Sequence, residues 1–438
     1  MTDTCSVQFH VEPGGRLQGE LRVPGDKSIS HRSIMLGSLA EGVTEVSGFL
    51  EGEDSLATLA AFRAMGVAIE GPAAGRVTIQ GAGMHGLRQP AAALDLGNSG
   101  TSMRLMAGLL AGQAFDATLT GDASLSGRPM RRVVNPLGEM GASIGTTEAG
   151  TAPLLIRGGA DLHGIDYVLP VASAQVKSSV LLAGLYASGR TCVTEPAPTR
   201  DHTERMLAGM GYPLERQGSR VCLEGGHALQ GISIDIPADI SSTAFFLVGA
   251  SIAPGSDLLL AHVGMNPTRT GVIDILRLMG ADIEVVNPRE AGGEPVADLR
   301  VRSAGLKGID ILPELVPLAI DEFPVLFVAA ACAEGRTVLT GAEELRVKES
   351  DRIQVMADGL VELGIDAQAT PDGMVIEGGT LREGAVDSHG DHRIAMAFAM
   401  GALRASGRID IRDCANVNTS FPGFVDLAAR AGLQISAS

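Results

Sequence analysis

The chain has 438 residues, too many for one ordinary hydrophobic core, which predicts two domains. Apolar residues make up 45 % of it, enough for globular cores, and its formal net charge is −17. This acidic balance disfavours nucleic acid or an anionic membrane as the main partner, so an anionic small substrate would need a local cationic pocket.

The cysteines and the N-terminal stretch favour a cytoplasmic protein. The cysteines are odd in number and include no C-x-x-C pair, so we expect reduced thiols rather than a disulfide or zinc framework. They are Cys5, Cys192, Cys222, Cys332 and Cys414. The start, MTDTCSVQFH, lacks the apolar segment of a signal peptide, and no apolar run approaches the roughly 18 residues of a membrane span.

The first predicted helix follows a cluster of hydrogen-bond donors. Residues 23–33 are VPGDKSISHRS, and the apolar stretch IMLGSLAEG comes next. Six segments share one plan: an apolar stretch rich in Ala or Leu, a small or acidic residue with Gly, and a strand-like run. In chain order they are LGSLAEGVTEVSGF, AGLLAGQAFDATLTG, AGLYASGRTCVTEP, GASIAPGSDLLLAHV, AAACAEGRTVLTGA and GALRASGRIDIRDC.

A second marker alternates with the first: a predicted helix that ends in Gly before another strand-like run. Each glycine suits the position after a helix, where the backbone becomes left-handed. These glycines are Gly66, Gly141, Gly211, Gly280, Gly364 and Gly432. Both markers recur about every 70 residues, which predicts six α/β units, three in each half of the chain.

The two halves also match each other directly, because IPADIS at 236–241 resembles VPGDKS at 23–28. The shared proline, aspartate and serine can direct the chain and cap a helix. The second copy lacks the other polar residues, since Ile240, Ala244 and Phe245 replace Lys27, His31 and Arg32. A helix cap needs no lysine or arginine, so we expect these two cations to have another task, whereas His31 has no assigned role.

All six apolar helices are predicted to begin at polar clusters. Helix N-termini expose unpaired N–H groups and the positive end of the helix dipole, which favour anions. The clusters are GDKSISHRS, GNSGTSMR, SAQVKSS, ADISSTAF, AIDEFP and HGDHRIA. They could be ordinary caps, as we expect for ADISSTAF, or anion sites where Lys or Arg is also present.

Three familiar site motifs fit poorly. PGDKS is not a phosphate-binding P-loop, because Asp26 occupies the position of the required glycine. HGDH at 389–392 lacks a companion H-x-H or H-E-x-x-H pattern, so we do not expect a metal site. No G-x-G-x-x-G loop follows a predicted strand, which disfavours a nicotinamide cofactor.

Further cations occur in the later clusters. Arg128 lies in GDASLSGRPMRR and Arg200 in PTRDHTERM. In ELRVKESDR, the spacing predicts one helical face that carries Lys348, Glu349 and Arg352, although such a charge run is also typical of a solvated, salt-bridged helix.

These motifs together resemble the 5-enolpyruvylshikimate-3-phosphate synthase family. The motifs are GDKSISHR, LGNSGTSMR, GDASLSGRPM, ASAQVKSS, TRDHTE, RVKESDR and DHRIAM, in order and across nearly the whole chain. The resemblance implies an α/β fold of two similar domains, each with three βαβαββ repeats, and an active site in the interdomain cleft. We expect residues 1–25 plus 239–438 to form one domain and 26–238 the other, with crossovers near 22–26 and 235–240.

The reaction that this resemblance implies moves the enolpyruvyl group of phosphoenolpyruvate to the 5-hydroxyl of shikimate 3-phosphate and releases phosphate. It proceeds by addition and elimination through a tetrahedral intermediate, without a metal or organic cofactor. The protein would be a cytoplasmic, monomeric transferase of the shikimate pathway for aromatic amino acids, with no nucleic acid or membrane partner.

The resemblance also implies roles for particular residues. Asp321 would accept the 5-hydroxyl proton, and Glu349, with Lys27, would protonate the methylene carbon of phosphoenolpyruvate. Shikimate 3-phosphate would contact Lys27, Ser28, Arg32, Ser173, Ala174, Gln175, Arg200, Asp321 and Lys348. Phosphoenolpyruvate would contact Lys27, Gly100, Arg128, Gln175, Arg352 and Arg393.

One position departs from a branch of the family. That branch has KTFP near the C-terminus, where this chain has TSFP, so Thr419 stands where a phosphoenolpyruvate-binding lysine would be. Gly100 has no Cβ, and we predict that glyphosate, which resembles phosphoenolpyruvate, enters the site and inhibits. Inhibition of the native chain no stronger than that of a Gly100→Ala variant would contradict this.

Three alternatives compete with this function: a closely related transferase and two proteins of other classes. The sister transferase acts on a UDP-amino sugar and uses a loop cysteine, but the corresponding loop here, GDASLSGRP, has none. A terminal-phosphate cyclase for nucleic acid is disfavoured by the acidic charge and the absence of basic runs. An inactive anion-binding protein is disfavoured because Asp321 and Glu349 are present together with the site arginines.

Overall fold

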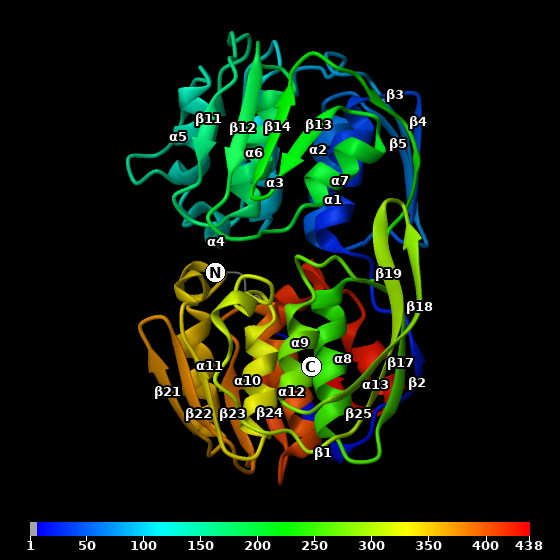
Figure 1. Ribbon diagram of the computed structural model, residues 1–438, viewed down its shortest axis with the longest axis vertical. Coiled ribbons are helices and arrows are strands. Elements are labelled where there is room, and N and C mark those ends of the chain that lie inside the picture. The colour runs from blue at the N-terminus through cyan, green and yellow to red at the C-terminus, as the bar shows by residue number, and fades with distance from the viewer. Residues whose placement is uncertain (1–6) are drawn as a thin grey trace. The chain divides into compact units, whose positions relative to one another are not determined.

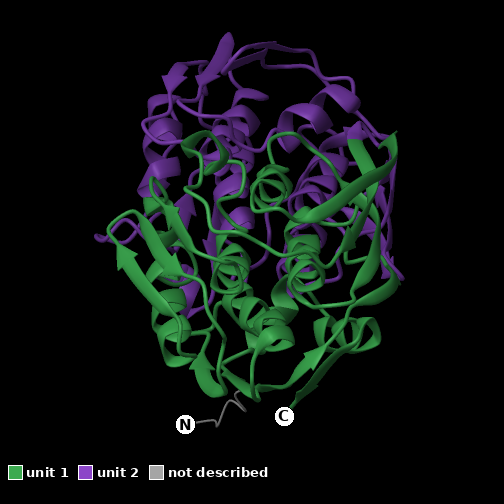
Figure 2. Cartoon of the chain, turned by 60° about the horizontal axis from the view of Figure 1, so that its bottom comes forward, with its two compact units in different colours: residues 1–24, 237–290, 295–438 green, residues 25–236, 291–294 purple. Residues whose placement is uncertain are grey.

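The computed structural model describes residues 7–438, and these form two compact units. Unit 1 comprises residues up to Pro24, then Pro237–Glu290 and Pro295–Ser438, whereas unit 2 comprises Gly25–Ile236 and Ala291–Glu294 (Figure 2). Each unit has its own cluster of buried apolar side chains, and no residue belongs to both clusters. Cys5 lies outside the described residues.

Each unit is built around three apolar inner helices (Figure 1). In unit 2 they are α1 (Lys27–Leu39), α3 (Gly100–Ala111) and α6 (Ala174–Gly184). In unit 1 they are α8 (Ile240–Ile252), α10 (Phe323–Ala331) and α12 (His392–Gly401). Every residue of α8 and α10 is buried, which explains why neither helix contains a charged side chain. The six inner helices are the six apolar segments of the sequence.

Six outer helices follow the inner ones in turn: α2 (Glu53–Ala64), α5 (Arg131–Glu139), α7 (His202–Gly209), α9 (Gly271–Leu278), α11 (Arg352–Glu362) and α13 (Phe424–Ala431). A glycine with φ between 81° and 120° follows each one. The predicted left-handed glycines after the second set of helices are therefore confirmed. A one-turn helix, α4 (Ala123–Ser126), precedes α5.

Unit 2 contains three four-stranded sheets. Their orders are β16-β4-β6-β5, β7-β8-β10-β9 and β11-β12-β14-β13, and each begins with a parallel pair and continues antiparallel. The strands are β4 (Val43–Ser47), β5 (Ala68–Ala73), β6 (Arg76–Gln80), β7 (Leu94–Asp95), β8 (Ala117–Thr120), β9 (Ile144–Gly145), β10 (Leu154–Ile156), β11 (Asp166–Val168), β12 (Arg190–Thr194), β13 (Leu214–Gln217), β14 (Arg220–Glu224) and β16 (Ser233–Asp235). A short pair joins β3 (Ala40–Glu41) to β15 (Leu229–Gln230).

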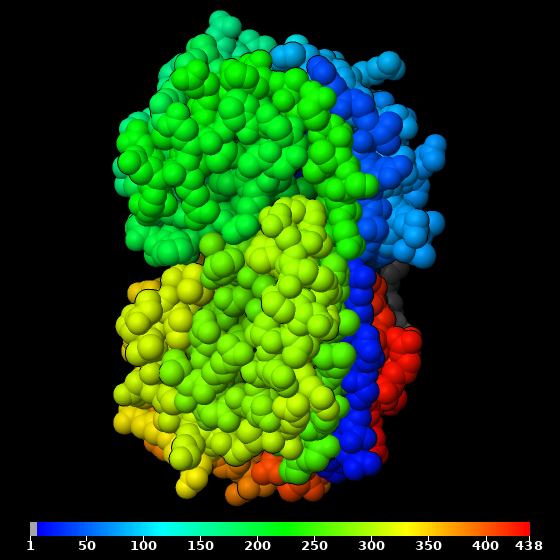
Figure 3. All heavy atoms as spheres, turned by 45° about the vertical axis from the view of Figure 1, so that its right-hand side comes forward, coloured from blue at the N-terminus to red at the C-terminus, as the bar shows by residue number. Residues whose placement is uncertain are grey.

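Unit 1 repeats this plan with the help of the N-terminal strands. Its sheets have the orders β23-β24-β1-β25, β18-β19-β17-β2 and β20-β22-β21. Their strands are β1 (Phe9–Gly15), β2 (Gln18–Leu21), β17 (Asp257–Gly264), β18 (Asp282–Ala291), β19 (Glu294–Arg302), β20 (Arg336–Leu339), β21 (Asp366–Thr370), β22 (Gly373–Glu377), β23 (Gly384–Asp387), β24 (Ile409–Arg412) and β25 (Leu433–Ala437). Figure 3 shows the blue N-terminal residues of this unit beside green residues of the paired strand β17.

Residues 7–438 also contain four short 3₁₀ helices: η1 (Pro313–Leu315), η2 (Glu343–Val347), η3 (Ala402–Arg404) and η4 (Ala415–Thr419).

One prediction about the cysteines is wrong. Cys192 and Cys222 form a disulfide, because they are direct cross-strand partners on β12 and β14. The two cysteines are 30 residues apart in the sequence. They become neighbours only through the register of the sheet, which the sequence pattern did not reveal. Cys332 and Cys414 are free thiols.

Candidate active site

The sequence-predicted residues of unit 2 gather at the N-termini of its inner helices. Lys27, Gly100 and Ala174 are the first residues of α1, α3 and α6. Asp26, Ser99 and Ser173 cap these helices by accepting hydrogen bonds from backbone N–H groups. The caps fix where each helix begins, so these three starts present N–H groups of the kind that bind anions.

Gln175 and Arg128 flank the start of α3. The Gln175 carboxamide receives a 2.5 Å hydrogen bond from Arg104 Nη1 and donates one of 3.1 Å to Thr101 Oγ1, which sets its orientation. Arg128 Nη2 donates to Asn98 Oδ1 at 2.6 Å. A Cβ atom at Gly100 would lie 3.2 Å from Arg128 Nη1 and 3.3 Å from Arg104 Nη1, so glycine leaves room for both guanidinium groups.

Arg32 lies buried between α1, α6 and α7 and is held by neutral groups. Its Nε donates to Thr203 Oγ1 at 2.7 Å, and its Nη2 donates to Ser178 Oγ at 2.9 Å. Its Nη1 donates to the Ser28 carbonyl at 2.9 Å. Burial lowers the pKa of Arg32 to about 10, and the negative charge of Glu204 opposes this shift. The guanidinium therefore stays charged at neutral pH.

Lys27 and Arg200 are each half-buried. Lys27 Nζ is 3.2 Å from Asp54 Oδ2 of α2, an ion pair that the sequence did not indicate. Asp54 lies in EGEDS, after a strand-like run, and nothing in that stretch indicates its partner. Arg200 lies in the loop before α7.

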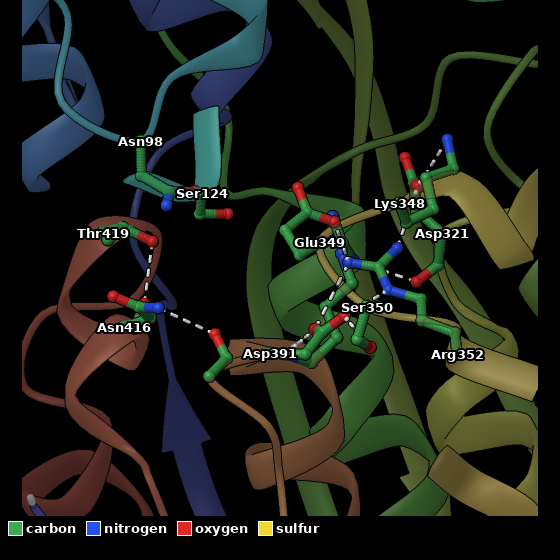
Figure 4. Close-up of polar contacts among 12 residues, drawn as sticks. Asn98, Ser124, Asp321, Lys348, Glu349, Ser350, Arg352, Asp391, Asn416 and Thr419 are labelled. Atoms are coloured by element: carbon green, nitrogen blue, oxygen red, sulfur yellow. Dashed lines mark hydrogen bonds and ion pairs between the residues drawn. The ribbon is translucent and has the colours of Figure 1, made fainter. Parts of the chain in front are cut away.

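In unit 1, the predicted carboxylates converge on Arg352, the first residue of α11 (Figure 4). Its side chain is 1 % exposed. Arg352 Nη2 is 2.6 Å from Glu349 Oε2, and Nη1 is 3.4 Å from Asp321 Oδ1. Lys348 Nζ lies 3.4 Å from the same Asp321 oxygen. Burial alone lowers the pKa of Arg352, but the surrounding carboxylates outweigh it and raise the pKa above its ordinary value.

Asp391 anchors this cluster and was absent from the predicted site. It is fully buried, and its Oδ2 accepts hydrogen bonds from Arg352 Nε at 2.8 Å and from Ser350 Oγ at 3.1 Å. Its Oδ1 caps α12 by accepting from the Arg393 backbone N–H. Arg393 in turn donates from Nη1 to the Asp321 carbonyl at 3.1 Å. The helix-cap position of Asp391 in HGDHRIA was the signal that could have found it.

The prediction that Lys348, Glu349 and Arg352 share one helical face is wrong. The 3₁₀ helix η2 ends at Val347, and α11 begins only at Arg352 because Asp351 caps it. Lys348 has a ψ of −148°, which is not helical, and it interrupts the helical pattern. The three side chains still meet, but a loop brings them together.

Thr419 is buried in η4 and bonds locally. Its Oγ1 donates to the Asn416 carbonyl at 2.7 Å, and Asn416 Nδ2 donates to the Gly390 carbonyl at 2.8 Å (Figure 4). The Thr419 hydroxyl therefore bonds within η4 and supplies no positive charge, while the Asn416 side chain connects η4 to the segment before α12.

The second copy of the repeated motif is a helix cap with its own ion pairs. Asp239 caps α8, as the sequence predicted, and Arg269 Nη2 lies 3.1 Å from its Oδ1. Ser241 donates to Glu322, and Arg269 also approaches that carboxylate at 3.9 Å. Protein carboxylates already occupy this helix start.

Within residues 7–438, no group of three or more His, Cys, Asp and Glu side chains is arranged to hold a metal ion. None of the helices in that range is long and apolar enough to cross a membrane.

The fold and these clusters define a class: two-unit α/β proteins of repeated βαβαββ segments, with cationic residues at helix starts and carboxylates grouped on a buried arginine. Within this class, the family model described as EPSP synthase (3-phosphoshikimate 1-carboxyvinyltransferase) matches residues 11–427. The chain belongs to the EPSP synthase family.

Named relatives agree with this membership. The chain is 73 % identical over 432 residues to the 3-phosphoshikimate 1-carboxyvinyltransferase of Methylococcus capsulatus, and the match covers 99 % of both chains. It is 74 % identical over 431 residues to the protein of that name from Alkalilimnicola ehrlichii, covering 98 % and 97 %. A solved EPSP synthase from Acinetobacter baumannii superposes with a TM-score of 0.90 at 60 % identity, covering 99 % of this chain and 100 % of that one.

Proposed function

We propose that this chain transfers the enolpyruvyl group of phosphoenolpyruvate to the 5-hydroxyl of shikimate 3-phosphate and releases phosphate. The observation that carries the proposal is the meeting of Asp321 and Glu349, two carboxylates with separate expected roles, on the single buried guanidinium of Arg352. Membership of the EPSP synthase family supports the same reaction and does not favour the UDP-amino sugar alternative.

In this reaction, Asp321 accepts the proton of the 5-hydroxyl as its oxygen attacks the central carbon of phosphoenolpyruvate. Glu349, with Lys27, donates a proton to the methylene carbon, which becomes a methyl group in the tetrahedral intermediate. Loss of a proton from this methyl group and departure of phosphate then restore the double bond. Lys348 and Arg352, each 3.4 Å from Asp321, hold that carboxylate in place.

The proposed binding sets follow the motifs that the chain shares with the family. For shikimate 3-phosphate we propose Lys27, Ser28, Arg32, Ser173, Ala174, Gln175, Arg200, Asp321 and Lys348. For phosphoenolpyruvate we propose Lys27, Gly100, Arg128, Gln175, Arg352 and Arg393. The arginines suit carboxylate and phosphate because their planar guanidinium groups can donate two parallel hydrogen bonds. The two compact units correspond, in this proposal, to the two domains of the family.

The test is phosphate release from the purified chain with both substrates, measured against reactions that lack one of them. We expect release only when both are present, at one phosphate for each enolpyruvyl group transferred. A parallel reaction replaces shikimate 3-phosphate with a UDP-amino sugar. Release with the sugar nucleotide and none with shikimate 3-phosphate would overturn the proposal.

We also propose that the chain acts in the cytoplasm as a monomer, without nucleic acid or membrane. Both proposed substrates are small molecules, and the net charge of −17 opposes polyanionic partners. Sedimentation equilibrium gives the mass of the particle, and a mass of two or more chains would contradict the monomer.

A further inference from the structure

Three charged side chains form a buried cluster in unit 2 to which the proposed chemistry gives no role. Lys177 lies in α6, Glu195 follows β12, and Glu204 lies in α7. Lys177 Nζ is 3.1 Å from Glu195 Oε2 and 2.8 Å from Glu204 Oε1. The three side chains are 1 %, 6 % and 4 % exposed. We call them the α6–α7 triad.

Such a cluster is a costly way to stabilise a fold. Removing charges from water carries a large desolvation penalty, and a well-packed apolar group is often at least as stabilising as a buried ion pair. The triad contains two carboxylates and one ammonium group, so it has a formal charge of −1. Glu204 Oε2 is buried and has no hydrogen-bond partner among residues 7–438, so part of this charge remains unsatisfied locally.

The triad joins two segments that carry proposed substrate contacts. Lys177 lies one turn into α6, whose first residues follow the cap Ser173. Glu195 Oε2 also accepts a 2.5 Å hydrogen bond from Thr199, the residue before Arg200. The ammonium group of Lys177 thus ties the loop that carries Arg200 to the start of α6.

The triad is linked to Arg32 through residues that are adjacent to it in the chain. Ser178 and Thr203, which accept hydrogen bonds from the Arg32 guanidinium, are the chain neighbours of Lys177 and Glu204. Thr203 also donates to Ser178 at 2.8 Å. No carboxylate pairs directly with this guanidinium in the contacts above, and the surplus negative charge of Glu204 is the largest favourable influence on its positive charge.

We propose that the α6–α7 triad is a positioning device for the shikimate 3-phosphate site. It holds α6, α7 and the loop before α7 together, and this sets the positions of Arg32 and Arg200. Its formal charge of −1 also stabilises the positive charge of Arg32. Lys177, Glu195 and Glu204 touch no substrate in this scheme. The inference rests on the proposed function.

The test replaces Lys177 with a nonpolar side chain of similar length, Lys177→Met, and measures KM for each substrate with the other saturating. This variant leaves two buried carboxylates without their cation, which loosens α7 and the loop from α6. We expect KM for shikimate 3-phosphate to rise about 10- to 100-fold, because small misplacements of binding groups have effects of this size. KM for phosphoenolpyruvate should change by less than about twofold.

The control is Arg190→Met, which breaks the exposed ion pair between Arg190 on β12 and Glu215 on β13 of the same unit. We expect both KM values to stay within about twofold of the native chain. A purely structural triad would lower the melting temperature of the Lys177 variant and leave both KM values unchanged, which would overturn the inference. A parallel rise of both KM values would overturn it as well.

A second variant decides the matter if Lys177→Met does not fold. Glu195→Gln keeps the shape of the side chain and an acceptor for Thr199, and it leaves the Lys177–Glu204 pair intact. We expect KM for shikimate 3-phosphate to rise, while KM for phosphoenolpyruvate stays within about twofold of the native value. Unchanged KM values would refute the positioning role. Inactivity of the native chain with both substrates would instead refute the proposed function, so the two failures are distinguishable.

Discussion

At the scale of single residues, Arg352 shows how one buried cation can bring together two carboxylates, Asp321 and Glu349, to which we assign the proton transfers. A guanidinium that is 1 % exposed requires negative partners, and it has Asp391 on its Nε edge and Glu349 on Nη2. Asp321 is held from two sides, by Arg352 and Lys348. The side chains of Asp321 and Glu349 remain 13 % and 23 % exposed, so both carboxylates are accessible to small molecules.

The role of Asp321 is testable with Asp321→Asn, which keeps its volume and removes the base. We expect kcat to fall by about 100-fold or more, the usual contribution of a general base, while KM for both substrates stays within about threefold. Steady-state phosphate release measures both constants. An unchanged kcat would remove Asp321 from the mechanism. The control is Asp310→Asn, at an exposed position of the same unit, for which we expect an unchanged kcat.

His31 makes the stability of the fold depend on pH. It is buried, and its Nδ1 lies 2.8 Å from Thr58 Oγ1 and 3.2 Å from Ser102 Oγ, so it joins α1 to α2 and α3. Burial, with the positive charges of Lys27 and Arg32, lowers its pKa from 6.5 to about 3, although Asp26 acts in the opposite sense.

Between these two pKa values, the unfolded chain binds a proton on His31 that the folded chain does not, so stability falls as the pH decreases. From about pH 7 to pH 5, this residue should lower the free energy of unfolding by about 2 kcal/mol. Urea unfolding of the native chain and of His31→Gln at both pH values isolates this contribution. Equal losses in the two proteins would show that His31 does not titrate in this way.

At the scale of elements, the two sets of helices follow different local rules. Five inner helices begin at an Asp or Ser whose side chain accepts a backbone hydrogen bond, and α10, which follows Glu322, is the exception. The outer helices instead have a left-handed glycine at their C-terminal end. Both rules act through neighbouring residues, so they are visible in the sequence.

Two glycines at the end of α7 separate backbone strain from packing. Gly211 has φ of +81°, and the nearest atom to an added Cβ is 3.9 Å away. Gly211→Ala should therefore destabilise the protein by about 1–2 kcal/mol through its backbone conformation alone. Gly209→Ala, inside the helix with its nearest atom at 4.0 Å, should stabilise it by about 0.5–1 kcal/mol. Denaturant unfolding measures both, and a loss of stability for Gly209→Ala similar to that of Gly211→Ala would contradict the explanation.

At the scale of the whole molecule, the N-terminal strands belong to the unit formed mainly by the second half of the chain. Strand β1 pairs with β24 on one side and β25 on the other, and β2 pairs with β17. Unit 1 therefore cannot complete two of its sheets from residues 237–438 alone. Because the two hydrophobic clusters are separate, damage to β1 should be confined to unit 1.

Val11→Asp tests this confinement, because Val11 is fully buried in the central strand β1. Burying an unpaired carboxylate there should cost about 3 kcal/mol or more. Hydrogen exchange should show lost protection in β24 and β25 and retained protection in β12 and β14. Equal loss of hydrogen-exchange protection in both units would contradict two separate cores. The control is Glu12→Ala, at an exposed position of the same strand, which should change the free energy of unfolding by less than about 0.5 kcal/mol.

The sequence by itself determined the repeats, the starts of the inner helices and the glycines after the outer ones. These features depend on apolar periodicity, caps and backbone conformation, which act over a few residues. It also placed the candidate cations at helix starts, because those residues lie beside the caps. The charge run around Lys348 misled the prediction, since helical spacing alone could not reveal that Asp351 starts a new helix.

Only the tertiary structure decided which distant residues meet. Three contacts join positions that become adjacent only through sheet register or helix packing. They are the Asp391–Arg352 and Asp54–Lys27 ion pairs and the Cys192–Cys222 disulfide. The α6–α7 triad arises in the same way, because α6, β12 and α7 converge on one buried point. Such contacts depend on how whole elements pack, and no local pattern in the chain encodes the partner of a buried charge.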